Sequence, residues 1–282
     1  MIKYRRGGSL HAVSKLFQCR GSVFPQSFAI AMPCAAVTFT LRYFMDQGYL
    51  LPLIEADQEH ILRDNSCWSG FTFLVGFLVV FRTSQAYTRF WDGCTSTHRM
   101  RAEWYDACSA LFAFTKMSTR SATEILKFQH LLVRLFSMLH AVALADIEDS
   151  NKEKVEHVAA FKYELVDAGG LDLSSLLAVK YSDAKVELVF QWIQQVIVEN
   201  IKSGVLSIPA PIVSRSFQEI ANGMVAFNEA IKISTIPFPF PYAQICECIL
   251  ILHWLVTPVA VVQFVATPWW GALFTFLLVF VY

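Results

Sequence analysis

Charged residues are scarce in this chain of 282 residues. Asp, Glu, Lys and Arg account for 16% of it, and 23 basic residues balance 23 acidic ones. A chain without net positive charge lacks the field that draws nucleic acid to a protein surface, so no nucleic-acid partner is expected. Hydrophobic residues make up 55%, 24 residues are phenylalanine, and the apolar excess gathers at the two ends. This distribution favours an integral membrane protein.

Residue patterns for metal binding and catalysis are also missing. The seven cysteines are scattered and odd in number, which gives no disulfide framework. Cys246 and Cys248 form a C-x-C pair, but no second Cys or His pair stands at zinc spacing. His98, His130 and His140 lack a motif such as H-E-x-x-H. We therefore expect no metal site, no cofactor and no enzymatic activity.

Three uncharged stretches predict four membrane spans. Residues 21–41 carry no Asp, Glu, Lys or Arg and match the roughly 20 residues that cross a bilayer. Residues 65–81, NSCWSGFTFLVGFLVVF, form a second uncharged run. Residues 248–282 are too long for one crossing, and two crossings joined near the ATPWW motif fit better, with Pro258 and Pro268 as interruptions. The last crossing then has only about 15 residues, so we expect the protein to continue beyond it.

The charges that flank these spans predict their orientation. Basic residues, from Lys3 to Arg20, precede the first span, whereas the loop between the first two spans carries five acidic residues and one arginine. By the positive-inside rule, the N-terminus faces the cytoplasm or its topological equivalent. We expect three parts: residues 1–82 with two spans, a helical cytosolic or stromal-side domain over 83–232, and residues 233–282 with two further spans.

The middle region has the pattern of amphipathic helices. In KVELVFQWIQQVIVENI, residues 185–201, apolar side chains recur at steps of three and four residues. Similar stripes run through 100–117, 124–145 and 214–232. Charged or Gly/Pro breaks lie at 146–154, 168–170 and 208–211. The expected fold class is an all-α membrane protein with four transmembrane spans and a helical cytosolic domain.

A proline-rich segment joins the middle region to the third span. In ISTIPFPFPYAQ, residues 233–244, proline stands at positions 237, 239 and 241. Proline lacks an N–H and disfavours helix in the residue before it. The segment is therefore predicted to be extended and poorly hydrogen-bonded.

Two arginines follow the second span in FRTSQAYTRFWDG, residues 81–93. Arg82 and Arg89 are seven residues apart, which places both on one face of a helix. They predict a positive collar that attracts anions where the helix leaves the membrane. The alternative interpretation is interfacial anchoring by the arginines and Trp91.

Glu247 and His253 are ionisable residues near or within the third span, where such groups are costly and often functional. They are candidates for a proton relay. The alternative is that Glu247 lies at the membrane interface and that His253 stays neutral against a backbone carbonyl.

Three motifs carry a resemblance to a known family. The FRTSQAYTRFWDG segment resembles the stretch after the second span of bestrophin-family channels, especially the bacterial and plastid branch. The IPFPFPYA segment resembles the proline-rich lead into that family's third span, and LFQCRGSVFPQS, residues 16–27, resembles its R-G-S motif. The resemblance implies a homopentameric anion channel in membrane lipid, with a central pore for chloride or bicarbonate. The plastid thylakoid and the plasma membrane both remain open as its location.

Two other functions remain as alternatives to a channel. One is a proton-coupled anion transporter that uses Glu247 and His253. The other is a membrane scaffold that conducts nothing.

The resemblance also implies a pore neck on the second span. Counting back 8, 12 and 16 residues from Arg82 gives Leu74, Gly70 and Ser66. Small side chains then stand where relatives have bulky aliphatic and phenyl groups. In the alternative register, Phe73 and Phe77 form the neck.

A second constriction at the cytosolic mouth is implied at Ile208 or Ile212. The sequence departs from the family pattern near the collar, because Ser84 and Gln85 stand where asparagine is usual. Cys94 replaces a basic residue, which weakens the collar by one charge.

Overall fold

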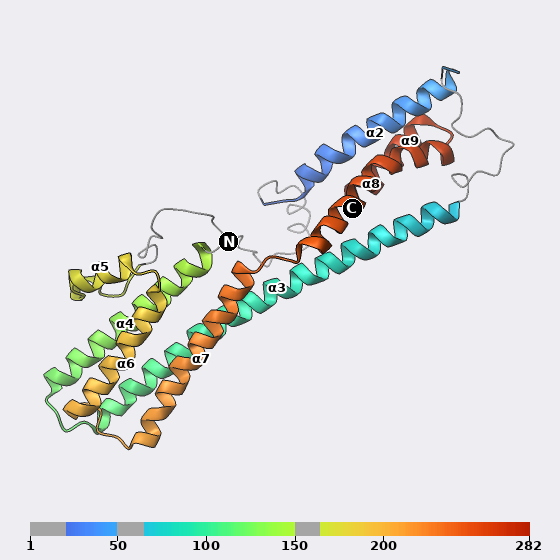
Figure 1. Cartoon of the computed structure of the whole chain (residues 1–282). Coiled ribbons are helices and arrows are strands. Elements are labelled where there is room, and N and C mark those ends of the chain that lie inside the picture. Colours follow the sequence, from blue (N-terminus) through green and yellow to red (C-terminus); the bar gives the residue numbers. More distant parts are fainter. Residues whose placement is uncertain (1–20, 50–64, 150–163) are drawn as a thin grey trace, which may run out of the picture. The chain divides into compact units, whose positions relative to one another are not determined.

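The computed structural model describes residues 21–49, 65–149 and 164–282, and every regular element within these ranges is helical (Figure 1). The predicted all-α class is confirmed for this part of the chain. The chain divides into two compact units. The terminal unit holds the described residues up to Gln85 together with Phe238–Tyr282, and the middle unit holds Ala86–Pro237.

The described residues of the terminal unit form four helices, one of them only in part. Helix α2 (Phe24–Asp46) and helix α9 (Pro268–Val281) lie side by side, and α8 (Phe240–Phe264) packs on both (Figure 1). The first part of α3 (Asn65–Phe114) completes the unit. Prolines stand in the first turns of α2, α8 and α9, where the missing N–H removes no intrahelical bond.

Small residues bring α2 and α9 close together. Ala31 and Ala35 are buried on α2, and a Cβ at Gly271 would lie 3.4 Å from the Thr38 methyl group. The Thr38 hydroxyl donates a hydrogen bond of 2.8 Å to the Thr275 hydroxyl. Close backbone approach and paired hydroxyls hold helices together where lipid removes the hydrophobic drive. This contact therefore suits a helix pair in a bilayer.

Among the described residues, the middle unit contains the rest of α3 and six further elements that are wholly its own. These are η1 (Thr115–Met117), α4 (Ala122–Asp149), η2 (Ala168–Gly170), α5 (Leu173–Tyr181), α6 (Lys185–Ser203) and α7 (Ala210–Thr235). Helix α4 packs against α6 and α7 (Figure 1). The predicted stripe of α6 is confirmed, because Val186, Val189, Ile193 and Ile197 are all buried.

The predicted breaks at 168–170 and 208–211 adjoin or overlap helix starts. The first coincides with the short element η2, and α7 begins at Ala210, inside the second. Most of the break at 146–154 lies outside the described residues. The predicted stripe at 100–117 forms the end of α3 and the adjoining η1. Helix α3 can run without a break from residue 65 to residue 114 because this segment contains no proline.

Three helices in the described ranges are long and apolar enough to cross a membrane: α2, α8 and Ala122–Glu148 of α4. Helices α2 and α8 carry most of the first predicted span and the start of the long run at 248–282. The second predicted span falls in the first part of α3, and the fourth falls in the shorter apolar helix α9. Half of the apolar stretch of α4 is buried within its unit, which explains its hydropathy as that of a core helix. Four spans therefore stay a prediction.

Trp104 sets how closely α3 and α7 approach in the middle unit. Its indole N–H donates a 3.3 Å hydrogen bond to the Ile220 carbonyl, and its side chain is 3% exposed. A Cβ added to Gly223 would lie 2.2 Å from the indole nitrogen. A side chain at this position would have to displace a buried ring that is held by a hydrogen bond.

We expect Gly223→Ala to lower the free energy of unfolding by about 1–3 kcal/mol, the usual cost of overpacking. Thermal unfolding of the purified protein in detergent measures it. Gly93→Ala is the matched control, because its added Cβ meets its nearest neighbour, the Ile233 side chain, at an ordinary 3.9 Å. Equal midpoints for the two variants would contradict the packing role of Gly223.

Candidate pore helix and the arginines that follow it

One face of α3 in the terminal unit is not packed against other described residues. Phe73 is 77% exposed, Phe77 is 59% exposed and Leu74 is 46% exposed. Gly70 lies beside them, and a Cβ added there would meet nothing within 4 Å among the described residues. Val75, on the opposite side of the helix, is fully buried. A charge-free, largely apolar face thus runs along α3, and none of the described residues covers it.

The two predicted neck registers share this face. By helix geometry, positions 73 and 77 lie at its centre, and position 74 lies toward one edge. Ser66 lies in the first turn of α3, seven residues before position 73. The structure therefore brings both sets together on one side, and the choice between the registers stays a prediction.

Arg82 lies two turns beyond Val75 on the packed side of α3. Its guanidinium carbon is 4.8 Å from the centre of the Phe238 ring, so the proline-rich segment supplies an aromatic face for this cation. Its Nη1 atom is buried and has no hydrogen-bond partner among the described residues. Sequence reasoning did not pair Arg82 with Phe238, although both occur in the two motifs that it singled out.

Arg89 makes a different contact in the middle unit. Its Nη2 atom donates hydrogen bonds of 2.7 Å to the Ile233 carbonyl and 2.8 Å to the Ile236 carbonyl. Helix α7 ends at Thr235, so these are carbonyl groups at a helix C-terminus, where cations are favourable. Neither of the two interpretations of Arg89 from the sequence, an anion-attracting collar or an interfacial anchor, included this capping bond.

The proline-rich segment is extended between α7 and α8, as predicted. Ile236 has φ −92° and ψ 105°, and Pro239 has φ −53° and ψ 124°. The extended part is shorter than the proline spacing implies, because α8 already begins at Phe240. Pro241 fits in the first turn of that helix, where its missing N–H costs nothing.

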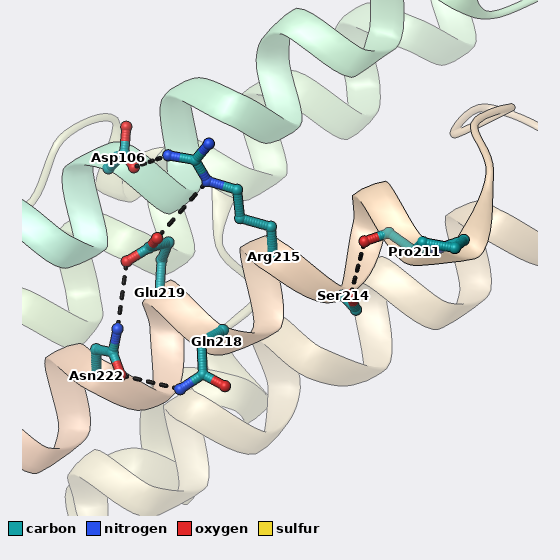
Figure 2. Close-up of polar contacts among 7 residues, drawn as sticks. All are labelled: Asp106, Pro211, Ser214, Arg215, Gln218, Glu219 and Asn222. Carbon is teal, nitrogen blue, oxygen red and sulfur yellow. Dashed lines mark hydrogen bonds and ion pairs between the residues drawn. The ribbon is translucent and has the colours of Figure 1, made fainter.

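The candidate cytosolic constriction lies at the start of α7. Ile208 packs against the core of the middle unit, whereas Ile212 is 48% exposed. Of the two, Ile212 is the one available to a pore. The Ser214 hydroxyl donates 2.7 Å to the Pro211 carbonyl and so completes the first turn (Figure 2).

A polar network follows Ile212 along α7. Arg215 lies 3.7 Å from both Asp106 and Glu219, and Asn222 donates to Glu219 (Figure 2). A hydrogen bond with Glu219 is the largest cause of a raised pKa at Glu103 on α3; burial and the negative charge of Glu219 add to it. Acidic and basic groups are thus interleaved along α7 after Ile212.

Glu247 and His253 are not brought together. Glu247 is exposed on α8, whereas His253 is fully buried. Six helical residues separate them by about 9 Å along the axis and place them on different faces. His253 lies among the rings of Trp68, Phe71 and Tyr282. The expectation of a carbonyl partner is wrong among the described residues, since neither ring nitrogen has one.

These features define a helical membrane protein with an uncovered apolar helix face that leads toward two arginines. The family model of the bacterial and fungal bestrophin proteins matches residues 1–282, and the chain belongs to this family. Comparison with curated proteins found no match.

Solved structures share the fold. A variant of a bacterial bestrophin homologue from Klebsiella pneumoniae is 12% identical, with a TM-score of 0.62 over 91% of this chain and 86% of that one. A second variant of that homologue is 13% identical, with a TM-score of 0.56 over 89% and 84%. A structure described as a membrane protein variant is 12% identical, with a TM-score of 0.63 over 91% and 84%.

We expect Arg89→Gln to lower the free energy of unfolding by about 1.5–3 kcal/mol, the usual worth of hydrogen bonds to a charged group. The substitution leaves the Ile233 and Ile236 carbonyls without their cationic partner. Thermal unfolding in detergent measures the loss. Arg101→Gln, which removes the same charge from an exposed position of α3, is the control. A similar loss in both variants would show that charge alone matters and would remove the capping role.

Proposed function

We propose that the protein is a homopentameric anion channel that conducts chloride, and also bicarbonate, through a central pore. The observation that carries the proposal is the uncovered face of α3 in a chain of the bestrophin family. One helix per subunit cannot enclose a pore, so a ring of subunits must bring copies of this face together. Five is the number that the family resemblance implies.

The mechanism requires no side-chain chemistry. An anion that enters a ring of apolar and aromatic side chains loses part of its hydration, and the positive edges of phenyl rings offset part of that cost. In the second register Phe73 and Phe77 would offer such edges, whereas Gly70 and Ser66 would leave the pore wider. Large, weakly hydrated anions should therefore pass more readily than small ones. The neck is assigned to Ser66, Gly70 and Leu74, with Phe73 and Phe77 as the second register.

Ile212 is the better candidate for the cytosolic constriction because it is exposed, whereas Ile208 is held in the core. The exposed apolar side chains of α2 and α8 suit contact with lipid or with neighbouring subunits. Arg82 keeps an anion-attracting role, and Arg89 contributes its charge from a capped helix end.

We expect purified protein in planar bilayers to give currents whose reversal potential follows the chloride gradient. The reason is that an apolar neck with positive charge nearby admits anions and rejects cations. Measurement under opposed sodium and chloride gradients separates the two ions. A reversal potential that tracks sodium would eliminate the anion channel. Saturable flux that moves protons and vanishes in Glu247→Gln would favour a transporter, and absence of flux would favour a scaffold.

Single cysteines along α3 distinguish the neck registers. If Ser66, Gly70 and Leu74 line the pore, cysteine at each of them should react with a water-soluble thiol reagent and lower the current. Cysteine at 73, which lies about 100° around the helix from 74, should then be shielded by neighbouring subunits. The fully buried Val75 provides the control, since cysteine there should stay unreactive in either register. Reaction at 73 and 77 with protection at 70 and 74 would assign the gate to the phenylalanines.

A further inference from the structure

A cavity of about 120 Å³ lies between α3 and α8 in the terminal unit. Arg82 and Thr83 line it from α3, Cys246 lines it from α8, and Tyr282 lies at its wall. The remaining lining residues are valine, leucine and isoleucine. The cavity adjoins the packed side of α3, about half a turn around the helix from Phe73 and Phe77. It is therefore separate from the face assigned to the pore.

The charge of Arg82 is not balanced at this cavity. The described residues that line it include neither aspartate nor glutamate. The buried Nη1 atom of Arg82 has no hydrogen-bond partner in the described part of the chain. Thr83, Cys246 and Tyr282 line the same cavity, but none of them bonds this atom. The Phe238 ring stabilises the cation from one side, but a π face supplies no countercharge. A buried guanidinium nitrogen without a countercharge or acceptor is costly, even where the rest of the side chain is only partly buried, and an anion would reduce that cost.

The other polar groups of the lining suit an anion. The Thr83 hydroxyl is the exception, because it already donates its single proton to the Val79 carbonyl at 2.8 Å and has none left for an anion. The Tyr282 hydroxyl and the Cys246 thiol are hydrogen-bond donors by chemistry. One permanent cation with neutral donors around it selects a single negative charge.

We propose that this cavity binds a small monovalent anion, such as chloride, bromide, nitrate or bicarbonate, within each subunit and beside the pore. The volume sets the upper size, because 120 Å³ is about four times the roughly 30 Å³ that a water molecule occupies. A sugar acid such as gluconate is too large. The proposal goes beyond conduction, since the site binds its anion whether or not the protein passes current.

The test is thermal unfolding of the purified full chain in neutral detergent, with sodium bromide replacing sodium gluconate at constant ionic strength. An anion that binds only the folded state raises the unfolding midpoint by mass action. We expect a saturating rise with bromide for the unchanged protein. Arg82→Gln should remove the rise or shift its half-saturation to at least tenfold higher bromide.

Arg89→Gln is the matched control, because it removes the same charge seven residues further along α3. It should lower the midpoint without bromide and keep the rise with bromide. Loss of the rise in both variants would place the bound anion in the field of the collar and overturn the cavity assignment. A midpoint that responds to added phosphatidylglycerol but not to bromide would assign the cation to a lipid headgroup and overturn it as well.

Bromide anomalous scattering from crystals of the unchanged protein gives a result even if Arg82→Gln does not fold. The expected outcome is a peak within hydrogen-bond distance of Arg82 Nη1 in every subunit. Peaks only along the central axis, or none, would overturn the proposal. Bromide at Arg82 in a protein that fails to conduct would leave this site standing and reject only the channel.

Discussion

The ends of two helices depend on an arginine that reaches their last carbonyl groups. Arg89 of α3 bonds the carbonyls of Ile233 and Ile236 at the end of α7. Arg42 of α2 bonds those of Val262 and Ala266 at the end of α8, at 3.3 and 3.0 Å, and pairs with Asp46 at 3.1 Å. Helix α7 ends two residues before Pro237, and α8 ends four residues before Pro268, the first residue of α9. In or near lipid, carbonyls left without donors would cost several kcal/mol each. These two bonds allow the chain to break its helices there.

This constraint also explains why α3 is long and the helices around it are not. The chain from 65 to 114 contains no proline, so nothing forces a break. Helix α7, by contrast, is bounded by Pro209 and Pro237. One continuous helix can carry an uncovered apolar face in the terminal unit and a buried Trp104 in the middle unit. In the proposed channel, α3 is thus both the pore helix and a core helix.

Periodicity and proline spacing predicted much of the fold, because both act locally. The stripe of α6, the apolar α2 and α8, and the extended residues around Pro239 follow from the order of residue types. The contacts of Arg89 with Ile233 and of Arg82 with Phe238 could not be predicted in this way, since their partners are about 150 residues away and are fixed by packing. The expected carbonyl partner of His253 was wrong for a related reason. The sequence around a single helical histidine does not show that the rings of Trp68 and Tyr282 will surround it. The neck register was undecided in the sequence because the same helix face includes both sets.

Arg82 and Arg89 show how far equal spacing can mislead. A separation of seven residues puts both on one face of α3, and from charge alone they form one collar. Their partners separate them: Arg89 bonds two carbonyls of a helix end, and its charge is partly offset by the negative end of that helix. Arg82 has an aromatic ring and an orphaned nitrogen, so its charge is offset by nothing in the described chain. Attraction of an anion depends on uncompensated charge rather than on the number of cations. Of the two residues, Arg82 is therefore the one whose field an anion would feel most, and Arg89 serves chiefly to hold α7 against α3.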